Sequence, residues 1–183
     1  MNQDMKYGYL DETYETICPL GEQDIFLAKN RDNGRIFVKK YVAASVIPVY
    51  EKLIAIRNEH LENIYDFAAG EERGILITGY ISGISVQQYL EYYGVFAEER
   101  VKDYMADILE VLGQVHALGI VHRDITAGNI MISDDGIVKL ILELPAKSKK
   151  NREKIPWYLE PLDMQHLNNL DFTSRMQGQT YML

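Results

Sequence analysis

The sequence predicts an α+β protein built as two lobes, with strands in the first lobe and helices in the second. One observation is a series of short runs rich in alternating, β-branched and aromatic residues. The other is a long segment with apolar residues at helical spacing, which comes after those runs. In a chain of 183 residues, strands first and helices later favour a sheet-containing lobe joined to a helical lobe.

Five strands are expected in the first lobe, as one antiparallel sheet. The runs that predict them are 14–20, 24–30, 34–42, 63–70 and 74–80. The stretch RDNG (31–34), between the second and third runs, is typical of a hairpin turn. One helix is expected over 49–56, because its apolar residues have helical spacing and Pro48 suits a first helical turn.

Two helices are expected in the second lobe. A short one over 85–94 ends at Gly94, and a longer one over 97–119 ends at Gly119. An apolar strand, NIMI, follows at 129–132. The longer helix carries one apolar stripe, made of Val101, Tyr104, Met105, Ile108, Val111, Leu112 and Val115.

The composition excludes several functions. A formal net charge of -8 argues against binding of nucleic acid or an anionic membrane, since both favour a basic surface. Cys18 is the only cysteine, so no intrachain disulfide can form and a cytoplasmic location is expected. The N-terminal stretch MNQDMKYGYL lacks the features of a signal peptide, and no apolar run is long enough to span a bilayer.

The stretch HRDITAGN (122–129) places Asn129 five positions after Asp124, between the long amphipathic helix and an apolar strand. It resembles the catalytic loop of protein kinases, which reads His-Arg-Asp with an Asn five residues after the Asp. The resemblance implies that Asp124 accepts the proton of a substrate hydroxyl and that Asn129 holds Mg²⁺. His122 and Arg123 are expected to brace the loop.

The resemblance also implies a lysine that binds the ATP phosphates. Protein kinases carry it on the third strand, two positions after a small apolar residue on the same face. Val38 and Lys40 fit that pattern, and Lys39 fits if FVKK is aligned one residue earlier, so both lysines stay open. Val38 is also expected to contact the nucleotide. Glu51, nine residues before His60, is expected to pair with this lysine.

The segment ILITGYISG (75–83) is similar to the last small-lobe strand and the hinge of protein kinases. Thr78 is then the gatekeeper residue, and the backbone of Gly79, Tyr80 and Ile81 binds adenine. Gly21 stands where the family carries its glycine-rich phosphate loop. The stretch LGEQDIFLA (20–28) lacks the later glycines, so fewer N–H groups can contact phosphate.

These matches predict a protein-kinase-like two-lobe fold. It would have a small lobe (1–78) complete with antiparallel sheet and the family's αC helix, a hinge (79–83), and a partial helical large lobe with the catalytic loop (84–141). Protein kinases then carry Asp-Phe-Gly, whose Asp binds metal. Here Leu142, Glu143 and Leu144 replace it, and an apolar leucine cannot coordinate Mg²⁺.

A shifted reading frame would explain this loss, and it predicts a poorly ordered tail over 142–183. If LILEL (140–144) is encoded CTG ATT TTG GAA TTG, a second copy of its TGAT restores Leu-Ile-Asp-Phe-Gly-Ile. The shifted frame of 154–183 then permits DTMVLGTAGYAAPEQFGFHKSDARTDIYA, which resembles the end of a kinase activation segment. The restored text is most similar to bacterial, Hanks-type serine/threonine kinases.

The resemblance implies a transferase that uses ATP and Mg²⁺ to phosphorylate a Ser or Thr hydroxyl of a protein substrate. Because the metal-binding Asp is replaced, this chain is expected to transfer phosphate poorly or not at all. The alternative is a pseudokinase that binds nucleotide or a partner protein without turnover.

Overall fold

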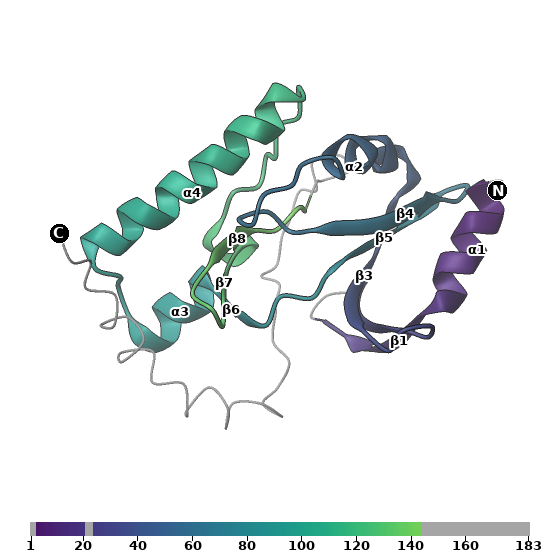
Figure 1. Ribbon diagram of the computed structural model, residues 1–183, viewed down its shortest axis with the longest axis horizontal. Coiled ribbons are helices and arrows are strands. Elements are labelled where there is room, and N and C mark those ends of the chain that lie inside the picture. The colour runs from purple at the N-terminus through teal and green to yellow at the C-terminus, as the bar shows by residue number, and fades with distance from the viewer. Residues whose placement is uncertain (1–2, 21–23, 144–183) are drawn as a thin grey trace.

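The computed structural model describes residues 3–20 and 24–143, which form two lobes (Figure 1). The first lobe contains two α-helices, a short 3-10 helix and five strands. The helices are α1 (Gln3–Thr13), η1 (Ala44–Val46) and α2 (Ile47–Leu53). The strands are β1 (Tyr14–Pro19), β2 (Ile25–Asn30), β3 (Ile36–Ala43), β4 (Ile64–Ala69) and β5 (Arg73–Gly79).

The five strands form one antiparallel sheet in the order β1-β2-β3-β5-β4, which confirms the predicted sheet. β3 is the central strand, and its Lys40 lies opposite Ile25 of β2 and Leu76 of β5. Successive side chains of a strand point to opposite faces, so the side chains of Lys39 and Lys40 lie on opposite faces of the sheet.

One face of the sheet packs against α1, a helix that the sequence patterns did not predict. Apolar residues on α1 are not gathered into a clear stripe, and Leu10 is the one fully buried there among the described side chains. Tyr7 packs beside it at the edge of the cluster. The buried residues of this cluster are Leu10, Tyr14, Ala28, Phe37, Ala68, Ile75 and Ile77.

The other face of the sheet packs against α2, which ends at Leu53 and is shorter than the helix predicted over 49–56. Pro48 lies in its first turn, as predicted. Tyr50 and Leu53 enter a larger apolar cluster that also contains residues of the second lobe, such as Val111 and Leu140. A shared core of this kind resists separation of the two lobes.

The second lobe contains α3 (Val86–Tyr93), α4 (Glu98–Ala117), the short helix η2 (Ala127–Asn129) and a three-stranded antiparallel sheet. Its strands are β6 (Gly83–Ser85), β7 (Ile130–Ser133) and β8 (Val138–Leu140). The sequence predicted α3, α4 and β7. It did not predict β6 and β8, because three residues are too few for a periodic pattern to emerge.

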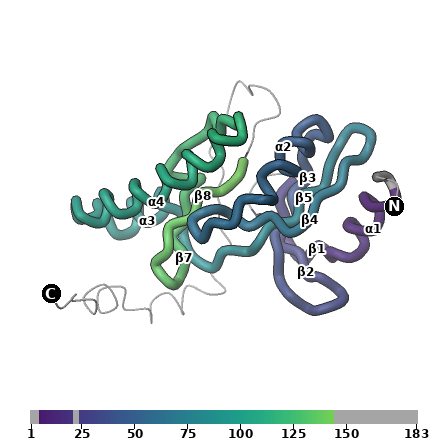
Figure 2. Tube along the Cα trace, turned by 45° about the horizontal axis from the view of Figure 1, so that its top comes forward, coloured from purple at the N-terminus to yellow at the C-terminus, as the bar shows by residue number. Residues whose placement is uncertain are grey.

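The helix α4 buries only part of its predicted apolar stripe. Tyr104, Ile108, Val111 and Val115 are buried, whereas Val101 and Met105 are 42% and 45% exposed. Leu109, outside the predicted stripe, is 59% exposed. In Figures 1 and 2, α1 and α4 lie on opposite sides of the small-lobe sheet. Among the described residues, no helix has the length and apolar character needed to cross a membrane.

Candidate active site

A buried ion pair joins Lys40 of β3 to Glu62, which lies between α2 and β4. Lys40 Nζ donates to both carboxylate oxygens of Glu62, over 2.7 and 2.8 Å. Thr78, the predicted gatekeeper, donates its hydroxyl to Glu62 Oε1 over 2.7 Å. All three side chains are buried. The carboxylate balances the buried ammonium, and the hydroxyl adds a further hydrogen bond.

The predicted pairing of the lysine with Glu51 is wrong. The buried residues of α2 are Ile47, Tyr50 and Leu53, which recur at a spacing of three along the short helix. Glu51 follows Tyr50 by one position and therefore turns toward solvent, where it is exposed. The sequence did contain a signal for the true partner, since Glu62 is a carboxylate between two buried apolar residues, Leu61 and Ile64.

Lys39 points to the opposite face, where it holds α1. Its Nζ donates to the carbonyl oxygens of Asp11 and Tyr14, over 3.0 and 3.1 Å. It also lies 2.6 Å from the Asp11 carboxylate. Of the two lysines that the sequence left open, Lys40 therefore belongs to the site with Glu62, and Lys39 secures the end of the N-terminal helix.

The catalytic-loop residues are tied together within the second lobe. Asn129 Nδ2 donates to the Asp124 carboxylate over 2.7 Å and to the Asp124 carbonyl over 3.0 Å. His122 is buried, and its Nε2 donates to the Ile141 carbonyl over 2.7 Å. Arg123 is exposed and has φ 64°, a left-handed conformation that is uncommon for residues other than glycine. His122 thus bonds the loop to the segment that follows β8, whereas the Arg123 side chain is exposed.

Residues 141 and 142 connect the catalytic loop with the Lys40 pair. Ile141 N donates to the Asn129 carbonyl over 2.9 Å. The next amide, Leu142 N, donates to Glu62 Oε2 over 2.9 Å. Leu142 is fully buried, although the sequence interpretation assigned it to the out-of-frame tail, so the ordered core continues at least one residue further. The rest of that predicted tail, from 144 onward, lies outside the described residues.

The predicted hinge connects β5 to β6. Gly79 N donates to the Asn63 carbonyl over 2.9 Å, and Tyr80 is partly exposed while Ile81 is half-buried. At Gly83 a Cβ atom would lie 2.0 Å from the Ile132 carbonyl oxygen, so only glycine permits this close approach of hinge and β7. Val38, predicted to contact the nucleotide, is buried on the Lys40 face of β3.

A cavity of about 450 Å³ lies behind the hinge, between β4 and the turn that joins β7 to β8. Its lining includes Asn63, Tyr65, Tyr80, Ser82, Asp134 and Lys139. Lys40, Asp124 and Asn129 do not line it. Gly79, Tyr80 and Ile81 of the predicted hinge do line it, so the cavity shares only the hinge with the site that the sequence predicted.

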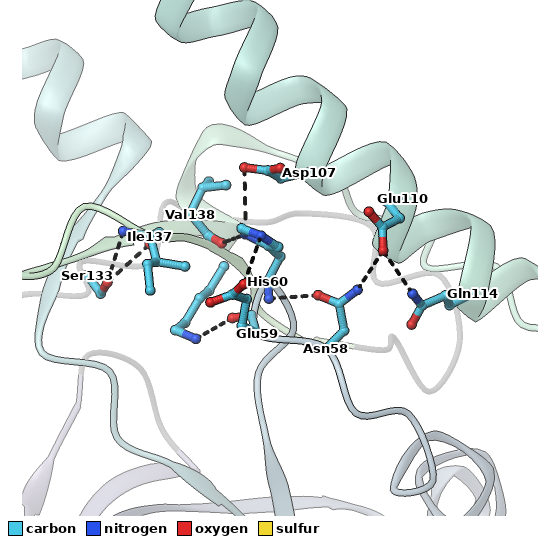
Figure 3. Close-up of polar contacts among 10 residues, drawn as sticks. Asn58, Glu59, His60, Asp107, Glu110, Gln114, Ser133, Ile137 and Val138 are labelled. Atoms are coloured by element: carbon cyan, nitrogen blue, oxygen red, sulfur yellow. Dashed lines mark hydrogen bonds and ion pairs between the residues drawn. The ribbon is translucent and has the colours of Figure 1, made fainter. Parts of the chain in front are cut away.

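The loop between α2 and β4 attaches the small lobe to the large lobe, as Figure 3 shows. His60 Nδ1 donates to the Val138 carbonyl over 2.9 Å and lies 3.7 Å from the Asp107 carboxylate. Asn58 Nδ2 donates to Glu110 of α4 over 3.4 Å. These contacts place Glu62, two residues after His60, on a segment that is bonded to β8 and faces α4.

The segment between β1 and β2 is the one for which the sequence predicts a phosphate loop. Leu20 N, before this segment, donates to the Ile25 carbonyl over 2.8 Å. Asp24 has φ 90° and pairs with Arg73 at the start of β5. Gly21 lies outside the described residues, so its predicted contact with phosphate stays a prediction.

The residues present do not form a full magnesium site. Asn129 offers an oxygen ligand, but the position of the family's metal-binding Asp is occupied by the buried apolar side chain of Leu142. Among the described residues, no group of three or more His, Cys, Asp or Glu side chains could hold a metal ion. Mg²⁺ would therefore lack one of its expected carboxylates here.

A two-lobed fold with a strand lysine paired to a buried glutamate, and with a catalytic-loop Asp bonded to an Asn five residues later, defines the kinase class. The protein kinase domain family matches residues 21–142 of the 183-residue chain. This chain belongs to the protein kinase domain family.

Individual relatives are serine/threonine kinases from plants and bacteria. The chain is 27% identical over 142 residues to the probable serine/threonine protein kinase IRE of Arabidopsis thaliana, covering 70% of this chain and 12% of that protein. It is 36% identical over 90 residues to a serine/threonine-protein kinase, drp72, of Corynebacterium efficiens, covering 46% of this chain and 17% of that one. The chain thus spans only a small part of these relatives.

The fold is similar to that of a crystal structure of Rad53 1-466 in complex with AMP-PNP. The TM-score is 0.65 at 20% sequence identity, and the match covers 75% of this chain and 40% of that one. This likeness shows the two-lobe kinase fold. The described residues include the complete small-lobe sheet and the part of the large lobe that contains α3 and α4.

Proposed function

We propose that this chain binds ATP beside Lys40 and descends from a serine/threonine protein kinase whose phosphoryl transfer it has lost or nearly lost. The observation that carries the proposal is a continuous set of contacts. Lys40 is bonded to Glu62, Glu62 to the Leu142 amide, and the neighbouring Ile141 amide to Asn129, which is bonded to Asp124. The groups needed for nucleotide and for substrate are thereby held together.

Each residue has a distinct role in this proposal. The Lys40 ammonium has three N–H donors and gives hydrogen bonds to the two Glu62 oxygens, so it can offer the remaining donor to a phosphate oxygen. The backbone of residues 79–81 would bind the adenine ring, and Val38 would cover it. ATP supplies the phosphoryl group, and Asp124 would orient the Ser or Thr hydroxyl of a protein substrate and accept its proton.

Loss of transfer follows from Leu142. Its apolar side chain occupies the position from which a carboxylate would neutralise the phosphates through a metal, and it is packed into the apolar core. Transfer without that electrostatic stabilisation is slow, whereas binding through Lys40 and the hinge is retained. This same observation favours the second candidate function, a pseudokinase that binds nucleotide or a partner without turnover.

Two measurements on the purified chain test the proposal. Binding of N-methylanthraniloyl ATP is expected for the unchanged chain and is expected to be lost in Lys40→Met. Incubation with radiolabelled ATP, Mg²⁺ and a generic protein substrate is expected to yield little or no labelled product. Robust labelling that disappears in Asp124→Asn would show an active kinase and overturn the proposed loss of transfer, and absence of nucleotide binding would overturn the ATP site.

A further inference from the structure

We infer that Glu62 is the residue that positions the Lys40 ammonium for nucleotide. We also infer that Glu62 is held by the hydrogen bonds between the α2–β4 loop and β8, and not by helix α2. The inference rests on the proposed ATP site and names the part of the chain that controls it. The sequence predicted that Glu51 of α2 would supply the carboxylate that pairs with the lysine, but Glu51 is exposed here.

The acceptor capacity of Glu62 is fully used by three partners. Oε1 accepts from Lys40 Nζ and from Thr78 Oγ1, each over 2.7 Å. Oε2 accepts from Lys40 Nζ over 2.8 Å and from the Leu142 amide over 2.9 Å. A carboxylate has about four lone-pair sites, so all of its acceptor positions are occupied. Such a group holds one orientation, and it holds the Lys40 ammonium with it.

Helix α2 has no carboxylate that could compete for Lys40. Glu51 is its single acidic residue, and this residue faces solvent. The helix contacts the site through Tyr50, whose hydroxyl donates to the Leu142 carbonyl over 3.1 Å, and through Leu53, which packs in the apolar cluster that contains Leu142. Leu142 therefore donates its amide to Glu62 and accepts at its carbonyl from Tyr50, and none of the three partners of the Glu62 carboxylate belongs to α2.

The backbone around Glu62 is bonded to β8 like a short strand. Glu62 N donates to the Leu140 carbonyl over 2.9 Å, and Leu140 N donates to the His60 carbonyl over 2.8 Å. Leu61 and Leu140 form a parallel bridge between these bonds. The Lys139 side chain donates to the Glu59 carbonyl beside it. Because two backbone bonds and a side-chain bond hold Glu62 to β8, a tilt of α2 is expected to leave the Lys40–Glu62 ion pair in place.

Matched variants of the two glutamates distinguish this inference from the alternative that Glu51 of α2 positions Lys40. Glu62→Gln removes the charge but keeps the shape of the side chain, and it is expected to weaken N-methylanthraniloyl ATP binding about tenfold, as loss of a charge-assisted contact does. Glu51→Gln removes the same charge from α2 and is expected to leave the affinity within about twofold, since exposed charges contribute little. Weakening by Glu51→Gln that equals or exceeds the effect of Glu62→Gln would overturn the inference.

A second readout does not depend on nucleotide. The double variant Lys40→Met with Glu62→Met replaces both charges by apolar groups, which avoids a lone buried charge. Its Leu142 amide is expected to exchange hydrogen at least about tenfold faster than in the unchanged chain, because that amide loses its acceptor. Amides of α4 serve as the control for intact folding. If the unchanged chain does not bind the ATP analogue, the proposed ATP site is wrong. Independently of that result, a Leu142 amide that exchanges at the same rate in the double variant would overturn the role of Glu62.

Discussion

Asn129 Nδ2 lies 2.7 Å from Asp124 Oδ2, and this hydrogen bond closes the catalytic loop on itself. The same amide nitrogen reaches the Asp124 carbonyl over 3.0 Å. Both bonds form within six residues of chain, and the Ile141 amide donates to the Asn129 carbonyl, which joins the loop to the segment that follows β8.

Replacing Asn129 tests how much these bonds stabilise the fold. Asn129→Ala is expected to lower the free energy of unfolding by about 1.5 to 3 kcal/mol, because one lost bond is to a carboxylate and the site is buried. Gln114→Ala, which removes an exposed amide from α4, is expected to change it by less than about 0.5 kcal/mol. Urea denaturation measures both, and equal effects would contradict a special role for the Asn129 bonds.

Lys39 and Lys40 are expected to respond differently to the same substitution. Lys39→Met leaves the Asp11 and Tyr14 carbonyls without their donor and is expected to destabilise the fold by about 2 kcal/mol. It should leave binding of the ATP analogue nearly unchanged, because Lys39 faces α1. Lys29→Met, at an exposed position of β2, serves as the control. A loss of nucleotide binding in Lys39→Met would show that the two lysines have been assigned to the wrong faces.

The attachment of α1 is expected to weaken in acid. Burial raises the pKa of Asp11, but hydrogen bonds from Lys39 and Tyr41, with the Lys39 charge, outweigh it and lower that pKa below its usual value. A carboxylate with a lowered folded-state pKa stabilises the fold above its unfolded pKa of about 4, and this contribution is lost as pH falls through the folded-state pKa.

The variant Asp11→Asn isolates this contribution. Its free energy of unfolding should fall below that of the unchanged chain at about pH 7, and the difference should shrink steadily below about pH 4. Urea denaturation at a series of pH values measures the difference. A gap between the two chains that stays constant down to about pH 2 would mean that Asp11 does not titrate with folding.

Leu142 is expected to behave as a core residue. Leu142→Ala should lower the free energy of unfolding by about 2 to 4 kcal/mol, since it empties a fully buried site in the apolar cluster. Leu109→Ala removes the same atoms from an exposed position of α4 and should cost less than about 0.5 kcal/mol. If both variants unfold at the same urea concentration as the unchanged chain, residue 142 does not belong to the core.

An exposed apolar row on α4 is expected to cause self-association. Val101, Met105 and Leu109 lie four residues apart on one face of the helix and are 42%, 45% and 59% exposed. Replacing Met105 with Glu and Leu109 with Lys should reduce light scattering and binding of a hydrophobic dye, with little change in stability. Persistent aggregation of this double variant would place the responsible surface elsewhere.

The sequence by itself determined the five small-lobe strands, α2, α3, α4 and β7, and it placed Asp124 and Asn129 in one loop. Alternating strands, a capped α3 and the stripe of α4 are local patterns, and the spacing of Asp124 and Asn129 lies within one short loop. Helix α1 was not predicted, because it has a single fully buried apolar residue, Leu10, among its described side chains. It is held to the sheet by Lys39, whose ammonium donates to the Asp11 carbonyl.

The tertiary structure alone decided which carboxylate meets Lys40. Glu51 and Glu62 are both acidic residues near the predicted helix, and only the length of α2 and the bonds of the following loop to β8 turn one outward and the other inward. It also decided that Leu142 is buried, since its neighbours come from α2, the loop at Glu62 and the second lobe. Contacts between segments about 80 residues apart depend on how the two lobes pack, which no local periodicity encodes.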